Sequence, residues 1–284
     1  MAPATEIKAQ DVQKLRQTTG AGLMDCKKAL VDAGGDFEKA IQLLREKGIA
    51  KSSKRADRVA GEGLVDTWIS PDGKEGVLLE MNCETDFVAR NEEFVKLAKN
   101  IINQIKDNPS WTSPDQILQQ PIQDLSAKIG EKLEARRFVR FKSPHGIVSA
   151  YIHAGSKLGV LTQIDSLKGA TEGLKELAKE INLQIAGMAP SYIHQKEVPA
   201  EAIEREKEIA KKQLEGQNKP AEILEKIAIG KLQQFYASQC LLDQVYVKDE
   251  AKKTTIKDLV AQAAKKDGTD FTVARFARFR VGAD

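Results

Sequence analysis

The chain has 284 residues, of which 41% are hydrophobic, so it is long enough for two or three domains with buried cores. Its 44 basic and 41 acidic residues leave a formal net charge of +3. This balance argues against a dedicated nucleic-acid-binding protein, because such a protein needs a concentrated basic face. No apolar run reaches the roughly 18 residues of a membrane-spanning helix, so we expect no membrane binding. A protein partner is the better expectation.

The start of the sequence and the cysteines indicate the cellular compartment. The first six residues, MAPATE, lack the basic and apolar segments of a secretory signal peptide. The three cysteines, Cys26, Cys83 and Cys240, are odd in number, far apart and without CxxC spacing. Disulfides and a thiolate metal site are therefore not expected, and a reducing cytoplasm fits.

Residues 1–50 predict a module of three short helices. A turn from Thr18 to Gly22 separates the first two helices, and Gly34-Gly35-Asp36 precedes the third. Leu23 and Met24, at the start of the second helix, fit a core position and a partner contact about equally well.

A first core subdomain is predicted at residues 62–143, after a basic segment, 51–61, that is more typical of a solvated linker than of a nucleic-acid-binding tail. Its pattern is two strands, helices and one strand. The expected elements are a hairpin of Gly63 to Ile69 and Gly76 to Met81, a helix from Phe94, a helical Ile122 to Leu133, and a strand of Arg136 to Lys142.

Part of this subdomain occurs twice in the chain. Gly63 to Asn82 aligns without gaps with Gly146 to Asp165 at an offset of 83, with seven identical positions. The helices that follow, 94–105 and 174–185, match at an offset of 80. The first copy therefore carries three extra residues between its second strand and its helix.

The repeat predicts a second core subdomain of the same kind, formed by residues 144–189 and 233–284 and closed by a strand of Ala274 to Gly282. Residues 190–232 interrupt it with two helical patterns, which predict an inserted antiparallel helical hairpin. The predicted fold class is thus α+β, with the three-helix module, two duplicated ββα…β subdomains with small antiparallel sheets, and the hairpin.

The three-residue insertion falls in the segment CETDFVARNEEF, residues 83–94. Asn91, followed by two acidic residues, is a typical start for the next helix. The segment before it is a short acidic loop that carries one bulky ring, Phe87, beside Asp86. The bland interpretation is that Asp86 caps its own turn. The sharper one is that this loop contacts a partner.

Sites for covalent chemistry are not predicted. The sequence has no GxxxxGK[ST] phosphate loop, no HExxH motif and no nucleophile-elbow serine. We therefore expect no enzyme activity, no cofactor, no metal and no direct nucleotide binding.

Two separated motifs, TDFVARN at 85–91 and TGAGLMDCKKAL at 19–30, resemble the elongation factor Ts family, the bacterial-type guanine-nucleotide exchange factors for elongation factor Tu. The resemblance covers nearly the whole chain. A second TDF, residues 269–271, runs into an apparent strand, so its phenylalanine is expected in the core.

The resemblance implies a mechanism and a set of contacts. The protein would bind elongation factor Tu in its GDP-bound and nucleotide-free states, and the Asp86-Phe87 loop would displace magnesium and GDP so that GTP can enter. The implied partner-binding residues are Asn82, Cys83, Thr85, Asp86, Phe87, Val88, Ile129, Gly130, His153, Arg16, Leu23 and Met24.

The resemblance also implies a ubiquitin-associated-like fold for residues 1–50, a homodimer contact at the helical hairpin, and a place in the cytoplasm or, as a mature form, in an organelle. An alternative remains open: a ubiquitin-associated-like adaptor or RNA-associated translation protein without exchange activity.

Overall fold

The chain has the mixed α+β fold that the sequence predicts, in a computed structural model that describes residues 7–19, 21–55, 57–214 and 221–283. Side chains are described for these residues except 48–55, 214, 221 and 222. Two units form within the chain, one from 1–66, 79–138 and 280–284 and the other from 67–78 and 139–279. The domain boundaries given above stay a prediction.

Three helices begin the chain: α1 (Ala9–Thr19), α2 (Leu23–Asp32) and α3 (Phe37–Arg55). Leu15, Cys26 and Leu30 are buried in the small core that they share. The Asp36 carboxylate accepts a hydrogen bond from the Lys39 amide at 3.0 Å, which caps α3 as predicted. Because no proline interrupts it, α3 continues through the first residues of the predicted linker, and these residues are helical instead.

The first sheet has the strand order β1-β2-β3, from β1 (Glu62–Ile69), β2 (Glu75–Cys83) and β3 (Glu134–Lys142). Between β2 and β3 lie α4 (Asp86–Ala89), α5 (Glu92–Asp107), a short 3-10 helix η1 (Pro114–Gln116) and α6 (Gln119–Ile129). The helix α5 buries Phe94, Ile101 and Ile105 on one face. The predicted helix to Leu133 is wrong, because α6 ends at Ile129, where Gly130 adopts a left-handed conformation with φ 87°.

The second sheet has the order β4-β5-β6, from β4 (Gly146–Ile152), β5 (Leu158–Ser166) and β6 (Phe271–Arg280), and it packs against α7 (Glu172–Met188). Phe271 is buried, which confirms that the phenylalanine of the second TDF belongs to the core. Sequence analysis missed one helix, α10 (Ile256–Asp267). A signal was present, because Thr255 and Asp258 form a capping box at its start.

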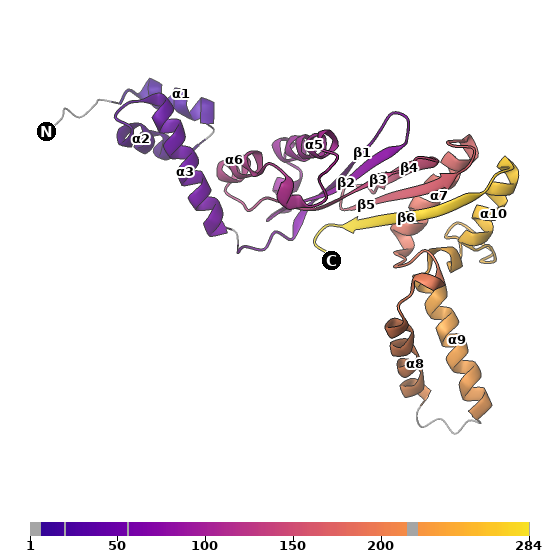
Figure 1. Cartoon of the computed structure of the whole chain (residues 1–284). Coiled ribbons are helices and arrows are strands. Elements are labelled where there is room, and N and C mark those ends of the chain that lie inside the picture. The colour runs from indigo at the N-terminus through magenta and orange to yellow at the C-terminus, as the bar shows by residue number, and fades with distance from the viewer. Residues whose placement is uncertain (1–6, 20, 56, 215–220, 284) are drawn as a thin grey trace. The chain divides into compact units, whose positions relative to one another are not determined.

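The predicted helical hairpin consists of α8 (Ala200–Leu214) and α9 (Ala221–Gln239), which lie side by side in Figure 1. The sequence predicts the second helix of the hairpin from Ala221 to Tyr236, and α9 continues to Gln239. Two 3-10 helices, η2 (Gln195–Glu197) and η3 (Leu241–Asp243), flank the hairpin. The predicted turn at 215–220 lies outside the described residues.

The two sheets repeat the same steric arrangement at corresponding glycines. A Cβ atom on Gly63 would lie 2.1 Å from the Met81 carbonyl oxygen, and one on Gly146 would lie 1.9 Å from that of Ile164. Met81 and Ile164 are themselves 83 positions apart, as are the glycines. The close approach of backbone to backbone leaves room for glycine alone and confirms the duplication.

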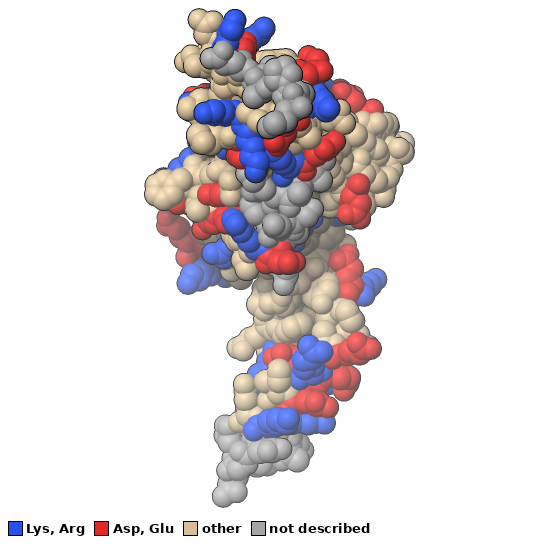
Figure 2. Space-filling model, turned by 90° about the vertical axis from the view of Figure 1, so that its left-hand side faces the viewer, with Lys and Arg blue, Asp and Glu red and all other residues tan. Residues whose placement is uncertain are grey.

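Acidic and basic side chains are intermingled on the face shown in Figure 2. Exposed ion pairs also form between residues of the same helix, such as Lys96 with Glu92 in α5 at 3.4 Å. Such pairs contribute little to stability. None of the described helices is long and apolar enough to cross a membrane.

We predict that Gly146→Ala lowers the free energy of unfolding by about 3 kcal/mol, because the new methyl group collides with main chain that cannot move without breaking the β4-β5 register. Gly187→Ala is the matched control: it lies in α7, its Cβ would meet no atom within 4 Å, and alanine favours helix by about 0.5 to 1 kcal/mol. Urea unfolding followed by circular dichroism measures both. Equal midpoints for the two variants would contradict the steric argument.

Candidate functional site

The insertion between β2 and α5 forms a one-turn helix, α4, where the sequence predicted a loop. Thr85 is its N-cap residue, and the Val88 amide donates to the Thr85 hydroxyl at 3.4 Å. Val88 and Ala89 are buried, whereas the Phe87 side chain is 82% exposed. The turn is therefore anchored on one face and presents a large apolar ring on the other.

The bland interpretation of Asp86 is wrong, because Thr85 and not Asp86 caps the turn. Asp86 instead forms an ion pair with Arg90 at 3.0 Å, one helical turn further on. Both side chains are solvent-exposed enough that the pair adds little stability. The Asp86 carboxylate thus stays near the surface next to the exposed ring.

Glu131 supports the start of α4 from another part of the chain. Its carboxylate accepts hydrogen bonds from the Glu84 amide at 3.1 Å, the Thr85 amide at 3.0 Å and the Thr85 hydroxyl at 2.7 Å. Sequence analysis singled out its two neighbours, Ile129 and Gly130, but not Glu131 itself. The half-buried Ile129 and the exposed Gly130 end α6 beside this contact.

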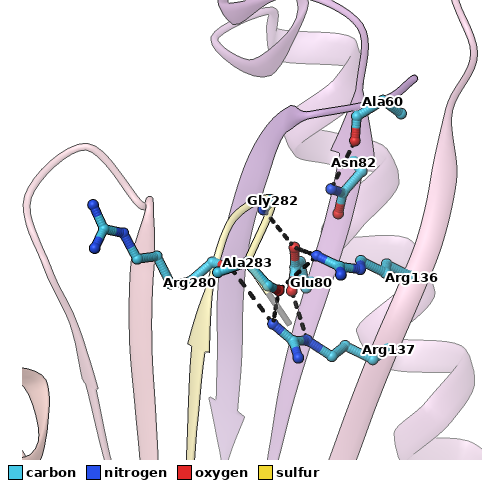
Figure 3. Close-up of polar contacts among 8 residues, drawn as sticks. All are labelled: Ala60, Glu80, Asn82, Arg136, Arg137, Arg280, Gly282 and Ala283. Atoms are coloured by element: carbon cyan, nitrogen blue, oxygen red, sulfur yellow. Dashed lines mark hydrogen bonds and ion pairs between the residues drawn. The ribbon is translucent and has the colours of Figure 1, made fainter. Parts of the chain in front are cut away.

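The strand that leads to α4 contains a buried charge. Glu80, fully buried in β2, pairs with Arg137 at 2.7 Å and with Arg136 at 3.2 Å, and accepts from the Gly282 amide at 3.1 Å. Both arginines also donate to the Ala283 carbonyl oxygen. Figure 3 shows this cluster, which ties β2, β3 and the last described residues together. A buried carboxylate needs such partners, because an uncompensated charge is costly away from water.

Asn82 and Cys83 are buried beneath the turn. The Asn82 amide donates to the Ala60 carbonyl oxygen at 3.0 Å, and the Cys83 thiol donates to that of Thr85 at 3.1 Å. Cys83 is thereby joined to the start of the turn and Asn82 to the segment before β1. A partner contact of either residue stays a prediction.

The remaining predicted site residues lie on other elements. Arg16 on α1 is exposed, and so are Leu23 and Met24 at the start of α2, with 49% and 73% of their side chains accessible. Neither Leu23 nor Met24 is therefore a core residue, and a partner contact through them stays a prediction.

His153 lies in the turn after β4, in the second unit, and is exposed. Its Nδ1 atom shares a hydrogen bond of 2.8 Å with the Tyr151 hydroxyl. The backbone of the turn is closed by hydrogen bonds from the His153 amide to Leu158 and from the Ser156 amide to His153. The imidazole is thus held at a fixed surface position.

Among the described residues, no group of three or more His, Cys, Asp and Glu side chains could hold a metal ion. The three cysteines are free thiols and all are buried. Burial, together with nearby Asp243 and Glu197, raises the pKa of the Cys240 thiol to about 11, so it stays protonated near neutral pH.

Comparison with known proteins agrees with the motif resemblance. The family model described as Elongation factor TS matches residues 84–283. Similar proteins named Elongation factor Ts come from Nautilia profundicola, 44% identical over 287 residues, and from Clostridium botulinum strain Alaska E43, 42% identical over 286 residues. Each alignment covers 97% of this chain and 93% of the relative. The chain belongs to the elongation factor Ts family.

The family match begins at Glu84, so it includes all of α4 and continues through β3, the second sheet and the hairpin. The longer alignments also cover most of the amino-terminal helices. This elongation factor Ts chain therefore exposes Phe87 on a turn that buried Val88 and Ala89 and the Glu131 carboxylate support.

We predict that Phe87→Ala changes the free energy of unfolding by less than about 0.5 kcal/mol, because the ring contributes little to the core. Phe94→Ala, a few residues away at a fully buried position, should cost about 3 to 5 kcal/mol. Chemical denaturation of both variants is the measurement. A large loss with Phe87→Ala would mean that the ring packs inside its own protein.

Proposed function

We propose that this chain is a guanine-nucleotide exchange factor for elongation factor Tu, and that α4 inserts Phe87 into the GTPase domain to displace magnesium and GDP. Membership of the elongation factor Ts family supports the first part. The observation that carries the second part is the 82% exposure of Phe87 on a turn whose neighbours are buried. The exposed ring is therefore available to enter a partner, and the buried neighbours fix the backbone that carries it.

The proposed reaction involves no covalent step. The factor lowers the affinity of its partner for the nucleotide, and the partner alone holds GDP, GTP and the magnesium ion. By thermodynamic reciprocity, the factor must bind nucleotide-free elongation factor Tu more tightly than the GDP-bound form. The ratio of these two affinities equals the factor by which it lowers the affinity of elongation factor Tu for GDP.

One wedge is not sufficient for a large effect. Burying a phenylalanine contributes about 1.5 to 3 kcal/mol. Lowering the affinity for a nucleotide by about four orders of magnitude requires roughly 5.5 kcal/mol of differential binding. We therefore propose additional contacts through Asp86, Ile129 and Gly130 near the turn, and through Arg16, Leu23, Met24 and His153 elsewhere.

The exposed apolar side chains of Leu23 and Met24 support a partner contact on the amino-terminal module, which we propose to be ubiquitin-associated-like. The same observation favours the second candidate, an adaptor that works through residues 1–50 without exchange activity. We further propose a cytoplasmic location and, for the helical hairpin, a contact between two copies of the chain.

We predict that Phe87→Ala slows GDP release from elongation factor Tu about tenfold or more, as expected for the loss of about 1.5 kcal/mol of differential binding. Stopped-flow release of a fluorescent GDP analogue is the measurement. Leu167→Ala is the matched control: Leu167 is also strongly exposed and follows β5, the strand that corresponds to β2. It should leave the rate unchanged.

The magnesium step has its own readout. When EDTA removes the magnesium ion, the GDP-release rates measured with wild type and with Phe87→Ala should become equal, because the wedge then has no ion to displace. An unchanged rate for Phe87→Ala with magnesium present would reject the wedge.

A deletion separates the two candidate functions. We expect a chain without residues 1–50 to bind nucleotide-free elongation factor Tu more weakly but still measurably, and this residual binding to depend on Phe87. Calorimetric titration of the shortened chain, with and without Phe87→Ala, measures both. Complete loss of binding on deletion, with no effect of Phe87→Ala in the full chain, would favour the adaptor.

A further inference from the structure

The helix α4 cannot hold its own orientation. It contains four residues, and a single helical turn is unstable in isolation because its first hydrogen bond orders several residues at once. Its N-cap bond, from the Val88 amide to Thr85, is long at 3.4 Å. The Phe87 ring, with 82% of its surface exposed, adds little packing of its own. Buried Val88 and Ala89 anchor one face of α4, and a further contact at its start can fix the direction in which the ring points.

The Glu131 carboxylate is placed to do this. It accepts from two consecutive backbone amides, Glu84 and Thr85, and from the Thr85 hydroxyl, so that both of its oxygens are used. Hydrogen bonds to an ionised acceptor are stronger than neutral ones. The three donors lie immediately before the first residue of α4, where the chain direction into the turn is decided.

The contact is reciprocal. The Glu84 carboxylate accepts from the Lys132 amide at 2.6 Å and also pairs with Arg58 at 3.3 Å. Each of the two neighbouring segments thus offers a carboxylate to the backbone of the other. Residues 84–85 and 131–132 are locked together by main-chain donors, which fix position more tightly than contacts between flexible side chains.

The backbone of Glu131 is itself immobilised. Gly130 ends α6 in a left-handed conformation, with its amide bonded to the Ser126 carbonyl oxygen at 2.9 Å. The buried Ser126 hydroxyl donates to the Glu131 carbonyl oxygen at 2.6 Å. The side chain therefore extends toward α4 from a rigid helix end.

We propose that Glu131 is the positioning residue of the exchange site, which orients Phe87 for insertion into its partner. This inference rests on the proposed function of Phe87. Glu131 acts through the turn and not by touching the nucleotide or the magnesium ion. A carboxylate suits the position because it is an acceptor only, and all three groups that face it are donors.

The test is a double-mutant cycle in the GDP-release assay. Glu131→Ala should slow release about tenfold, and Phe87→Ala should do the same or more. In the double variant the two effects should not multiply, because without the ring there is nothing left to position. A wild-type rate for Glu131→Ala, or fully multiplicative effects, would overturn the proposal.

Glu131→Gln and Glu134→Ala complete the design. Glutamine keeps the length of the side chain but replaces one acceptor oxygen by a donor, so its rate should lie between those of wild type and Glu131→Ala. Glu134, three residues further on, pairs with the Lys132 side chain at the surface instead of with the backbone of residues 84–85, so Glu134→Ala should match wild type. A defect in Glu134→Ala equal to that of Glu131→Ala would overturn the assignment.

Amide hydrogen exchange of the unbound protein keeps the two proposals separable. Glu131→Ala should speed exchange at Glu84, Thr85 and Val88 about tenfold, whether or not Phe87 acts as a wedge. If exchange responds but Phe87→Ala leaves GDP release unchanged, the proposed function fails and the exchange-site role fails with it. If Phe87→Ala slows release but Glu131→Ala alters neither exchange nor release, only the positioning role is overturned.

Discussion

The junction between the Glu131 carboxylate and the start of α4 joins segments that are 46 and 47 residues apart in sequence. The rest of the candidate site is organised beneath it. Buried Val88 and Ala89 hold one face of the turn, the buried strand β2 supplies its base, and the Glu80 cluster ties that strand to β3. A rigid support of this kind lets an exposed ring meet a partner without first losing conformational freedom, which is what pre-organisation means for binding.

Much of the architecture could be predicted because it follows from the periodicity of apolar residues over short stretches and from the internal repeat. Strand alternation, helical periodicity and the repeat at an offset of 83 gave two three-stranded sheets, and the structure has both. The Asn91 cap of α5 was also predicted, and the Asn91 side chain accepts from the Glu93 amide at 2.8 Å. The insertion of three residues marked where the copies differ, and in the structure only the first copy has a helical turn there.

The parts that were not predicted depend on contacts between distant residues. Glu131 looks like any other charged residue after a helix, and only the fold shows that it faces three donors at α4. Glu80 sits in an apolar strand with no partner nearby in sequence, since Arg136 and Arg137 lie more than fifty residues away. The helix end at Gly130 was misjudged for a simpler reason. A glycine in a helical pattern can be tolerated or can cap, and its left-handed φ is decided by the chain that follows.

The paired glycines, Gly63 and Gly146, carry a further consequence. In each copy the narrow backbone crossing sets the strand alignment upstream of the segment where the copies diverge. Changes of length beyond that crossing therefore leave the hairpin undisturbed. The connecting segment after the second strand can therefore differ in length between the two repeats, and only the first repeat carries the one-turn helix α4 there.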